Sequence, residues 1–149
     1  MSAPVDRPTS RFDWPAVRSG AGVCLVFAIP FSLAARWAAD SRDDSALAVL
    51  LTLGAIAGFV VGSGVAAWTQ RVGYPLVHGL VTASGTYIAA QAVFITIRLL
   101  TDRDVRWYAA LFNLTPVLFA GVVGGYLGLL LQRNGWQPSG ARRSGGDPR

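Results

Sequence analysis

The sequence has no lysine and no glutamate, and it holds a single cysteine and a single histidine. A lone cysteine cannot form an intramolecular disulfide, so Cys24 gives no reading of the redox compartment. One histidine and one cysteine, in different apolar stretches, supply too few ligands for a metal centre. We therefore expect no bound metal and no other cofactor.

The apolar stretches also lack the groups on which membrane pumps and enzymes depend. All eight acidic residues are aspartates, and every one lies outside those stretches. Proton-coupled transporters generally need a carboxylate inside the membrane. The sequence shows no Gly-rich phosphate loop, no Ser/His/Asp trio and no paired carboxylates. These absences predict a protein that is not an enzyme.

The sequence is rich in long apolar runs. Four runs carry no formal charge: Ser19–Ala35, Ser45–Gln70, Val72–Ile97 and Trp107–Gln132. A helix that rises about 1.5 Å per residue needs roughly 20 apolar residues to cross a hydrocarbon core about 30 Å thick. Three runs exceed that length, and the first reaches it if a flanking arginine snorkels to the surface.

These runs predict an all-α membrane protein whose four transmembrane helices form an antiparallel bundle of two hairpins. The predicted spans are residues 16–37, 46–68, 75–98 and 107–131, within a single transmembrane domain of residues 19–132. The two ends, residues 1–18 and 133–149, are rich in Pro, Ser, Gly and Arg. Such segments cannot bury enough apolar surface to fold, and we expect disordered tails.

The thirteen arginines predict the orientation in the membrane. With the N-terminus inside, eight arginines lie on the inner side and five on the outer side. The excess of basic residues on the inner side places both termini in the cytoplasm, and we expect the bacterial cytoplasmic membrane. The net charge of +5 then reflects contact with anionic lipid headgroups rather than with nucleic acid.

Glycine forms the most specific pattern in the chain. The second run has glycines at four-residue spacing, and the fourth run has a denser set: Gly54, Gly58, Gly62, Gly121, Gly124, Gly125 and Gly128. Residues four apart share a helix face, and a face without side chains lets two helix backbones approach closely. We favour packing within one chain, and the alternative is a seam between two copies or a groove for a partner helix.

Three polar residues inside the runs are candidates for function. His78 could relay protons or bind a ligand, but we favour an interfacial histidine bonded to a loop carbonyl or a lipid headgroup. Asn113 precedes Pro116 and is expected to satisfy the backbone where that proline interrupts the helix. Gln91 is expected to bond a neighbouring helix. A substrate site at Asn113 and Pro116 is the alternative, because interrupted helices build transporter sites.

The stretch from Gly58 to Val81 resembles small four-span bacterial membrane proteins of uncharacterised function. In that pattern a Gly-rich second span, here Gly58-Phe-Val-Val-Gly62, leads to a basic turn, Arg71-Val-Gly-Tyr-Pro75, and to the pair His78-Gly79. The resemblance implies the four-span architecture and supplies no activity.

The sequence thus predicts a non-enzymatic membrane protein that acts through helix–helix association, as an accessory or scaffold subunit. Its expected partners are the lipid bilayer and either further copies of itself or another membrane protein. No small-molecule substrate is indicated. The alternative is a small transporter or channel whose pathway forms in an oligomer.

Reporter fusions test the predicted orientation. Cytoplasmic reporters placed after Arg149 or in the turn at Arg71 should be active, and reporters placed between Asp40 and Asp44 should be silent, because of the arginine bias. Activity in the Asp40–Asp44 segment would reverse the orientation.

Overall fold

A computed structural model describes residues 12–41, 45–101, 104–105 and 107–136 of the chain. These ranges hold four helices and no strand: α1 (Trp14–Ser41), α2 (Ser45–Thr69), α3 (Pro75–Leu100) and α4 (Trp107–Arg133). All four contain a segment long and apolar enough to cross a membrane. The predicted all-α, four-helix fold is confirmed, and the chain is a multi-pass membrane protein.

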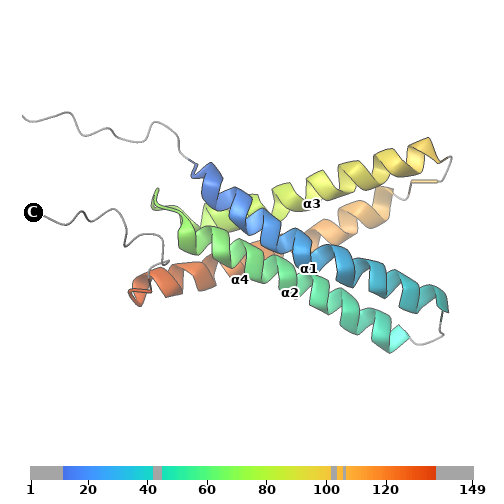
Figure 1. The fold of residues 1–149 in the computed structure, drawn as a ribbon, viewed down its shortest axis with the longest axis horizontal. Helices are drawn as coiled ribbons and strands as arrows, with labels where there is room; N and C mark the ends of the chain where they lie inside the picture. Colours follow the sequence, from blue (N-terminus) through green and yellow to red (C-terminus); the bar gives the residue numbers. More distant parts are fainter. Residues whose placement is uncertain (1–11, 42–44, 102–103, 106, 137–149) are drawn as a thin grey trace, which may run out of the picture.

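The four helices form two hairpins, α1–α2 and α3–α4, that meet at one end and separate at the other (Figure 1). Helices α2 and α3 each pack against all three other helices. Helices α1 and α4 each contact α2 and α3 but do not contact one another in the described ranges. We call the end that holds the start of α1 and the end of α4 the closed end, and the opposite end the open end.

Helix α1 begins earlier than the sequence predicted. Asp13 precedes it, and its Oδ1 accepts a hydrogen bond from the backbone N–H of Ala16 at 3.3 Å. An aspartate in this position satisfies one of the free N–H groups of the first turn. The prediction of a disordered tail over residues 1–18 is therefore wrong for residues 14–18, while residues 1–11 lie outside the described ranges.

Helix α4 also extends past its predicted end. Gly135 has φ +74°, its N–H donates to the carbonyl of Gln132, and the N–H of Trp136 donates to that of Leu131. This pair of bonds is a Schellman motif, which uses glycine in the left-handed region to satisfy the last carbonyls of a helix. The predicted disorder of residues 133–149 is wrong for residues 133–136, and residues 137–149 lie outside the described ranges.

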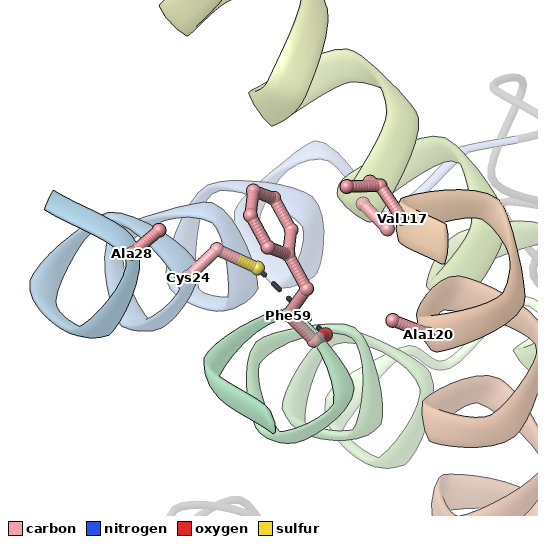
Figure 2. Packing of buried hydrophobic residues seen from close by; sticks show 6 residues of the cluster. Cys24, Ala28, Phe59, Val117 and Ala120 are labelled. Carbon is pink, nitrogen blue, oxygen red and sulfur yellow. Dashed lines mark hydrogen bonds between the residues drawn. The ribbon is translucent and has the colours of Figure 1, made fainter. Parts of the chain in front are cut away.

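The core is built from small side chains around one aromatic ring. Ala28, Cys24, Val117 and Ala120 surround Phe59 of α2, which brings α1, α2 and α4 together (Figure 2). The Sγ of Cys24 lies 4.0 Å from the carbonyl oxygen of Phe59. Small side chains leave little space between helices, and dispersion contacts between close backbones then replace the hydrophobic effect that lipid cannot supply.

Three glycines of α2, Gly54, Gly58 and Gly62, face α1. A Cβ on Gly54 would lie 2.7 Å from the ring of Phe31, and a Cβ on Gly58 would overlap the Cβ of Phe27. At Gly62 it would lie 2.6 Å from the carbonyl oxygen of Gly20 and 2.7 Å from the backbone nitrogen of Cys24. At Gly62 an added side chain would meet the backbone of α1, whereas at Gly54 it would have to displace the ring of Phe31.

The glycines of α4 face α2 and α3. A Cβ on Gly128 would lie 2.6 Å from the Cβ of Ala67, and one on Gly124 would overlap the hydroxyl of Ser63, both in α2. Gly121 and Gly125 lie against α3. The facing residue of α3 is Gly79, and a Cβ on Gly79 would lie 2.6 Å from the Cα of Gly125. All seven predicted packing glycines therefore lie at contacts within one chain.

Two alanine substitutions separate packing from helix propensity. Gly62→Ala should lower the free energy of unfolding in detergent by about 1–3 kcal/mol, because its methyl group would meet the backbone of α1. Gly22→Ala is the matched control, since a Cβ there meets nothing within 4 Å. Alanine is the better helix former by roughly 0.5–1 kcal/mol, so this control should be neutral or slightly stabilising. Equal stability of the two variants would contradict the close α1–α2 contact.

Candidate functional site

His78 lies at the closed end, near the start of α3, and its side chain is fully buried. Its Nε2 accepts a hydrogen bond from the backbone N–H of Asp13 at 2.9 Å, and its Nδ1 lies 2.8 Å from the carbonyl oxygen of Tyr74. An acceptor at Nε2 places the ring proton on Nδ1, which then donates to Tyr74. The imidazole is neutral in this arrangement, and both nitrogens are occupied.

Asp13 connects this histidine to the turn between α2 and α3. While its backbone N–H donates to His78, its Oδ2 accepts from the backbone N–H of Arg71 at 3.1 Å. The start of α1, the α2–α3 turn and the first turn of α3 are thus joined through one residue. The ring of Phe12 packs beside the imidazole, with 5.8 Å between the ring centroids.

Two glutamines complete the closed end. The Oε1 of Gln70 accepts from the N–H groups of Val72 and Gly73 at 2.8 and 2.9 Å. The Nε2 of Gln132, in the last turn of α4, lies within 3.2 Å of three carbonyl oxygens at the end of α2, those of Ala67, Trp68 and Gln70. We call Asp13, Gln70, His78 and Gln132 the polar clasp.

The polar clasp is saturated by the protein's own backbone. Every one of its side chains bonds a main-chain group of a turn or a helix end, where hydrogen-bonding groups would otherwise be unsatisfied. A group that already holds its partners in the folded state has no free site for a ligand. The geometry at His78 therefore serves helix assembly, in line with the structural interpretation of this residue.

Two threonines continue from His78 along α3. Thr82 and Thr86 are buried, and their hydroxyls are the buried side-chain polar atoms without a hydrogen bond among the described residues. Thr82 lies between α3 and α1, since a Cβ on Gly20 would lie 3.0 Å from its Cγ2. The row of polar side chains formed by His78, Thr82 and Thr86 therefore ends inside the bundle.

A cavity of ≈ 680 Å³ lies between the two hairpins, in the half of the bundle toward the open end. All four helices contribute to its walls, which are mainly aliphatic and aromatic. Its volume falls in the range of roughly 300–1,000 Å³ that is common for small-molecule pockets. The polar side chains on its walls are Ser32, Arg36, Thr52, Tyr87, Gln91 and Asn113. We call this cavity the cleft.

The two amides singled out in the sequence, Gln91 and Asn113, both line the cleft. The hydroxyl of Tyr87 ties α3 to α4 by donating to the carbonyl of Ala110 at 2.7 Å. In the described ranges Gln91, one turn further along α3, forms no hydrogen bond to a neighbouring helix, so that expectation is wrong. Asn113 is exposed and has no hydrogen bond among the described residues, so the predicted repair of the backbone near Pro116 is also wrong.

The mouth of the cleft is basic. The guanidinium of Arg36, from α1, lies 4.3 Å from the ring centroid of Phe94, and that of Arg98 lies 5.0 Å from the same centroid. Arg98 also donates to the carbonyl oxygen of Asp104 at 2.8 Å. Among the described residues neither arginine forms an ion pair with a carboxylate. Two cations from different hairpins therefore meet at one aromatic ring.

Sequence reasoning missed most of these arrangements. Asp13 could have been found from its position before a helical run, because aspartate is a preferred N-cap residue. Gln70 and Gln132 stand at the ends of two runs, where free backbone groups are expected. Arg36 and Arg98 gave no signal of convergence, since their meeting depends on how the two hairpins are placed.

Comparison with protein families, curated proteins and solved structures finds no match to this chain. The chemistry must therefore be read from the geometry alone. Across the described residues no three His, Cys, Asp or Glu side chains come together as a metal site. The two features that remain are a saturated closed end and a cleft with a basic mouth.

Substitution of His78 tests its structural role. His78→Gln should lie close to the wild type in thermal stability, because an amide can both accept from Asp13 and donate to Tyr74. His78→Leu leaves the N–H of Asp13 without an acceptor and should cost about 1–3 kcal/mol. If the two variants were equally stable but both reproduced the growth phenotype of a gene deletion, His78 would belong to the mechanism instead.

Proposed function

We propose that the chain is a non-enzymatic membrane protein that acts through helix–helix association in the bilayer, as an accessory or scaffold subunit. We place it in the bacterial cytoplasmic membrane with both termini in the cytoplasm, on the arginine bias and on the resemblance around Gly58–Val81. The partner that the geometry favours is a second copy of the chain. The surface through which we propose that the copies associate is one face of α3.

The seven packing glycines are already in use, so association needs another surface. The outer face of α3 supplies one: its second half presents Gly85, Ala89, Ala92 and Thr96, all exposed and spaced four, three and four residues apart. This spacing keeps them on one helix face. A Cβ on Gly85 would meet nothing within 4 Å, so this face is open.

The same face is a helix-packing surface in its first half. His78 and Thr82 lie on it, and α1 covers both of them at the closed end. Beyond Thr82 the hairpins separate, and the small residues that follow have no helix of this chain over them. This continuity of a used helix-packing face into an uncovered one is the observation that carries the proposal.

A second copy fits that uncovered face. Two α3 helices related by a twofold axis would bring Gly85 and Ala89 of one protomer against those of the other. Small residues permit the close approach on which association within lipid depends. The apolar outer surface of α4, with Phe112, Phe119 and Tyr126 exposed, presents bulkier groups that suit lipid better.

A small transporter or channel is the second candidate, and the cleft is the observation that favours it. The cleft reaches from the open end toward the centre of the bundle and has walls from all four helices. No carboxylate lines it among the described residues, which argues against proton coupling of the usual kind.

Disulfide crosslinking in nanodiscs or native membranes tests the association. Ala89→Cys should give a covalent dimer on mild oxidation, because small-residue packing brings Cβ atoms across the axis close to the roughly 3.5–4.5 Å of a disulfide. Ala57→Cys is the matched control, since this alanine is also exposed but lies on α2. Gly85→Leu should abolish the Ala89→Cys dimer, whereas Gly22→Leu on α1 should preserve it. A protein that stays monomeric at native density, with neither cysteine crosslinking, would overturn the proposal.

A further inference from the structure

The two arginines at the mouth of the cleft would be stabilised by a bound anion. Arg36 and Arg98 approach the same ring from different helices, and like charges held together repel one another. The ring of Phe94 offers each a weak attraction and cancels no charge. An anionic group beside the ring of Phe94, within reach of both guanidiniums, would offset the repulsion and accept hydrogen bonds from them.

The apolar walls behind that mouth suit an apolar chain. Phe94 itself lines the cleft, and deeper in the bundle the walls are formed by groups such as Ile56, Phe59 and Val117. A cavity of ≈ 680 Å³ with mainly apolar walls is too large to stay empty within hydrocarbon. An occupant with a charged head and an apolar tail satisfies both the mouth and the walls.

The polar side chains of the cleft fit the region between head and tail. Gln91 lies seven residues before Arg98 on α3, which is about 10 Å deeper along the helix. Asn113 lies on α4, the other helix of the same hairpin, and its amide has no hydrogen bond among the described residues. Its N–H groups are donors in need of an acceptor, and the ester carbonyls of a glycerolipid are acceptors at this depth.

We propose that the cleft is a binding site for one anionic phospholipid. The phosphate lies beside Phe94, where Arg36 and Arg98 both reach it, the ester region lies near Asn113 and Gln91, and one acyl chain lies along the walls as far as Phe59. This site is independent of the proposed association through α3, because the cleft residues lie on the other side of that helix from Gly85 and Ala89.

The charge at the mouth decides between this lipid and other occupants. A transmembrane helix of a partner would fill the apolar walls but would leave two arginines without a counter-charge. A free phosphate ion would neutralise the arginines but would leave the walls uncovered. A zwitterionic lipid brings its own cation to a site that already holds two.

Native mass spectrometry of the purified full chain tests the headgroup. Wild-type protein should retain phosphatidylglycerol about tenfold or more over phosphatidylcholine, and phosphatidylglycerol should raise its melting temperature. Arg36→Gln/Arg98→Gln should lose this preference. The matched control is Arg18→Gln/Arg133→Gln, which removes two exposed arginines at the closed end and should keep it. Equal retention of both lipids by wild type, or equal loss in both double variants, would overturn the proposal.

Two further measurements test the tail. Glycerol 3-phosphate, which has the phosphate without the chains, should not raise the melting temperature at concentrations where phosphatidylglycerol does. Ala90→Trp, which fills the cleft, should abolish lipid retention, whereas Ala89→Trp on the neighbouring position outside the cleft should not. Stabilisation by glycerol 3-phosphate would reduce the site to a simple anion site. Retention of lipid by a folded Ala90→Trp variant would place the lipid on the outer surface instead.

The proposed lipid site and the proposed dimer face lie on opposite sides of α3. Experiments can therefore contradict one proposal without contradicting the other. Loss of lipid selectivity in Arg36→Gln/Arg98→Gln with an intact Ala89→Cys dimer would support the cleft site regardless of oligomeric state. A dimer that Ala90→Trp breaks, and that never carries lipid, would show that a helix of the second copy fills the cleft, which overturns the lipid proposal.

Discussion

The structure depends on how closely the backbone of α2 can approach its neighbours. Glycines on one face of α2 bring it against α1, and the glycines of α4 bring that helix against the other face of α2 and against α3. The hairpins meet where the residues between them are glycine, alanine and serine, such as Gly124, Gly128 and Ser63. Toward the open end the residues between them are larger: Phe59, Tyr87 and Phe94. The cleft follows from this change of side-chain size along the bundle, since bulky groups hold the helices apart.

The fold was predictable because it depends on properties that are local in sequence. The length of each uncharged run predicts a span, and four-residue glycine spacing predicts a helix-packing face. Which helix a glycine face meets was not predictable, because identical spacing in α2 and α4 serves different partners. Helix ends were predicted within a turn but not their caps. Asp13 and Gln132 act on residues 58 and 65 positions away, which no local pattern reveals.

The candidate site was predicted in part, and for the same reason. His78 was identified by its rarity, and its interfacial position follows from the run that it opens. Its saturation by the Asp13 N–H needed the placement of α1 over α3. Arg36 and Arg98 each look like ordinary flanking arginines, and only the arrangement of the hairpins brings both to Phe94. The saturated closed end and the uncovered face and cleft beyond it divide the molecule into a fixed half and a half with free surfaces.

The bond between Asp13 and His78 has a consequence for the order in which the molecule is built. The acceptor for the Asp13 N–H stands 65 residues later in the chain, and the carbonyl groups at the end of α2 wait for Gln132, a further 54 residues on. During synthesis α1 and α2 can therefore pack against one another through the glycines of α2 as soon as both have left the translocon. Its own ends stay unfinished until the third and fourth helices enter the bilayer. A chain truncated before its last span would keep unsatisfied backbone groups at the end of α2. Quality-control proteases of the membrane could therefore distinguish it from the full-length protein.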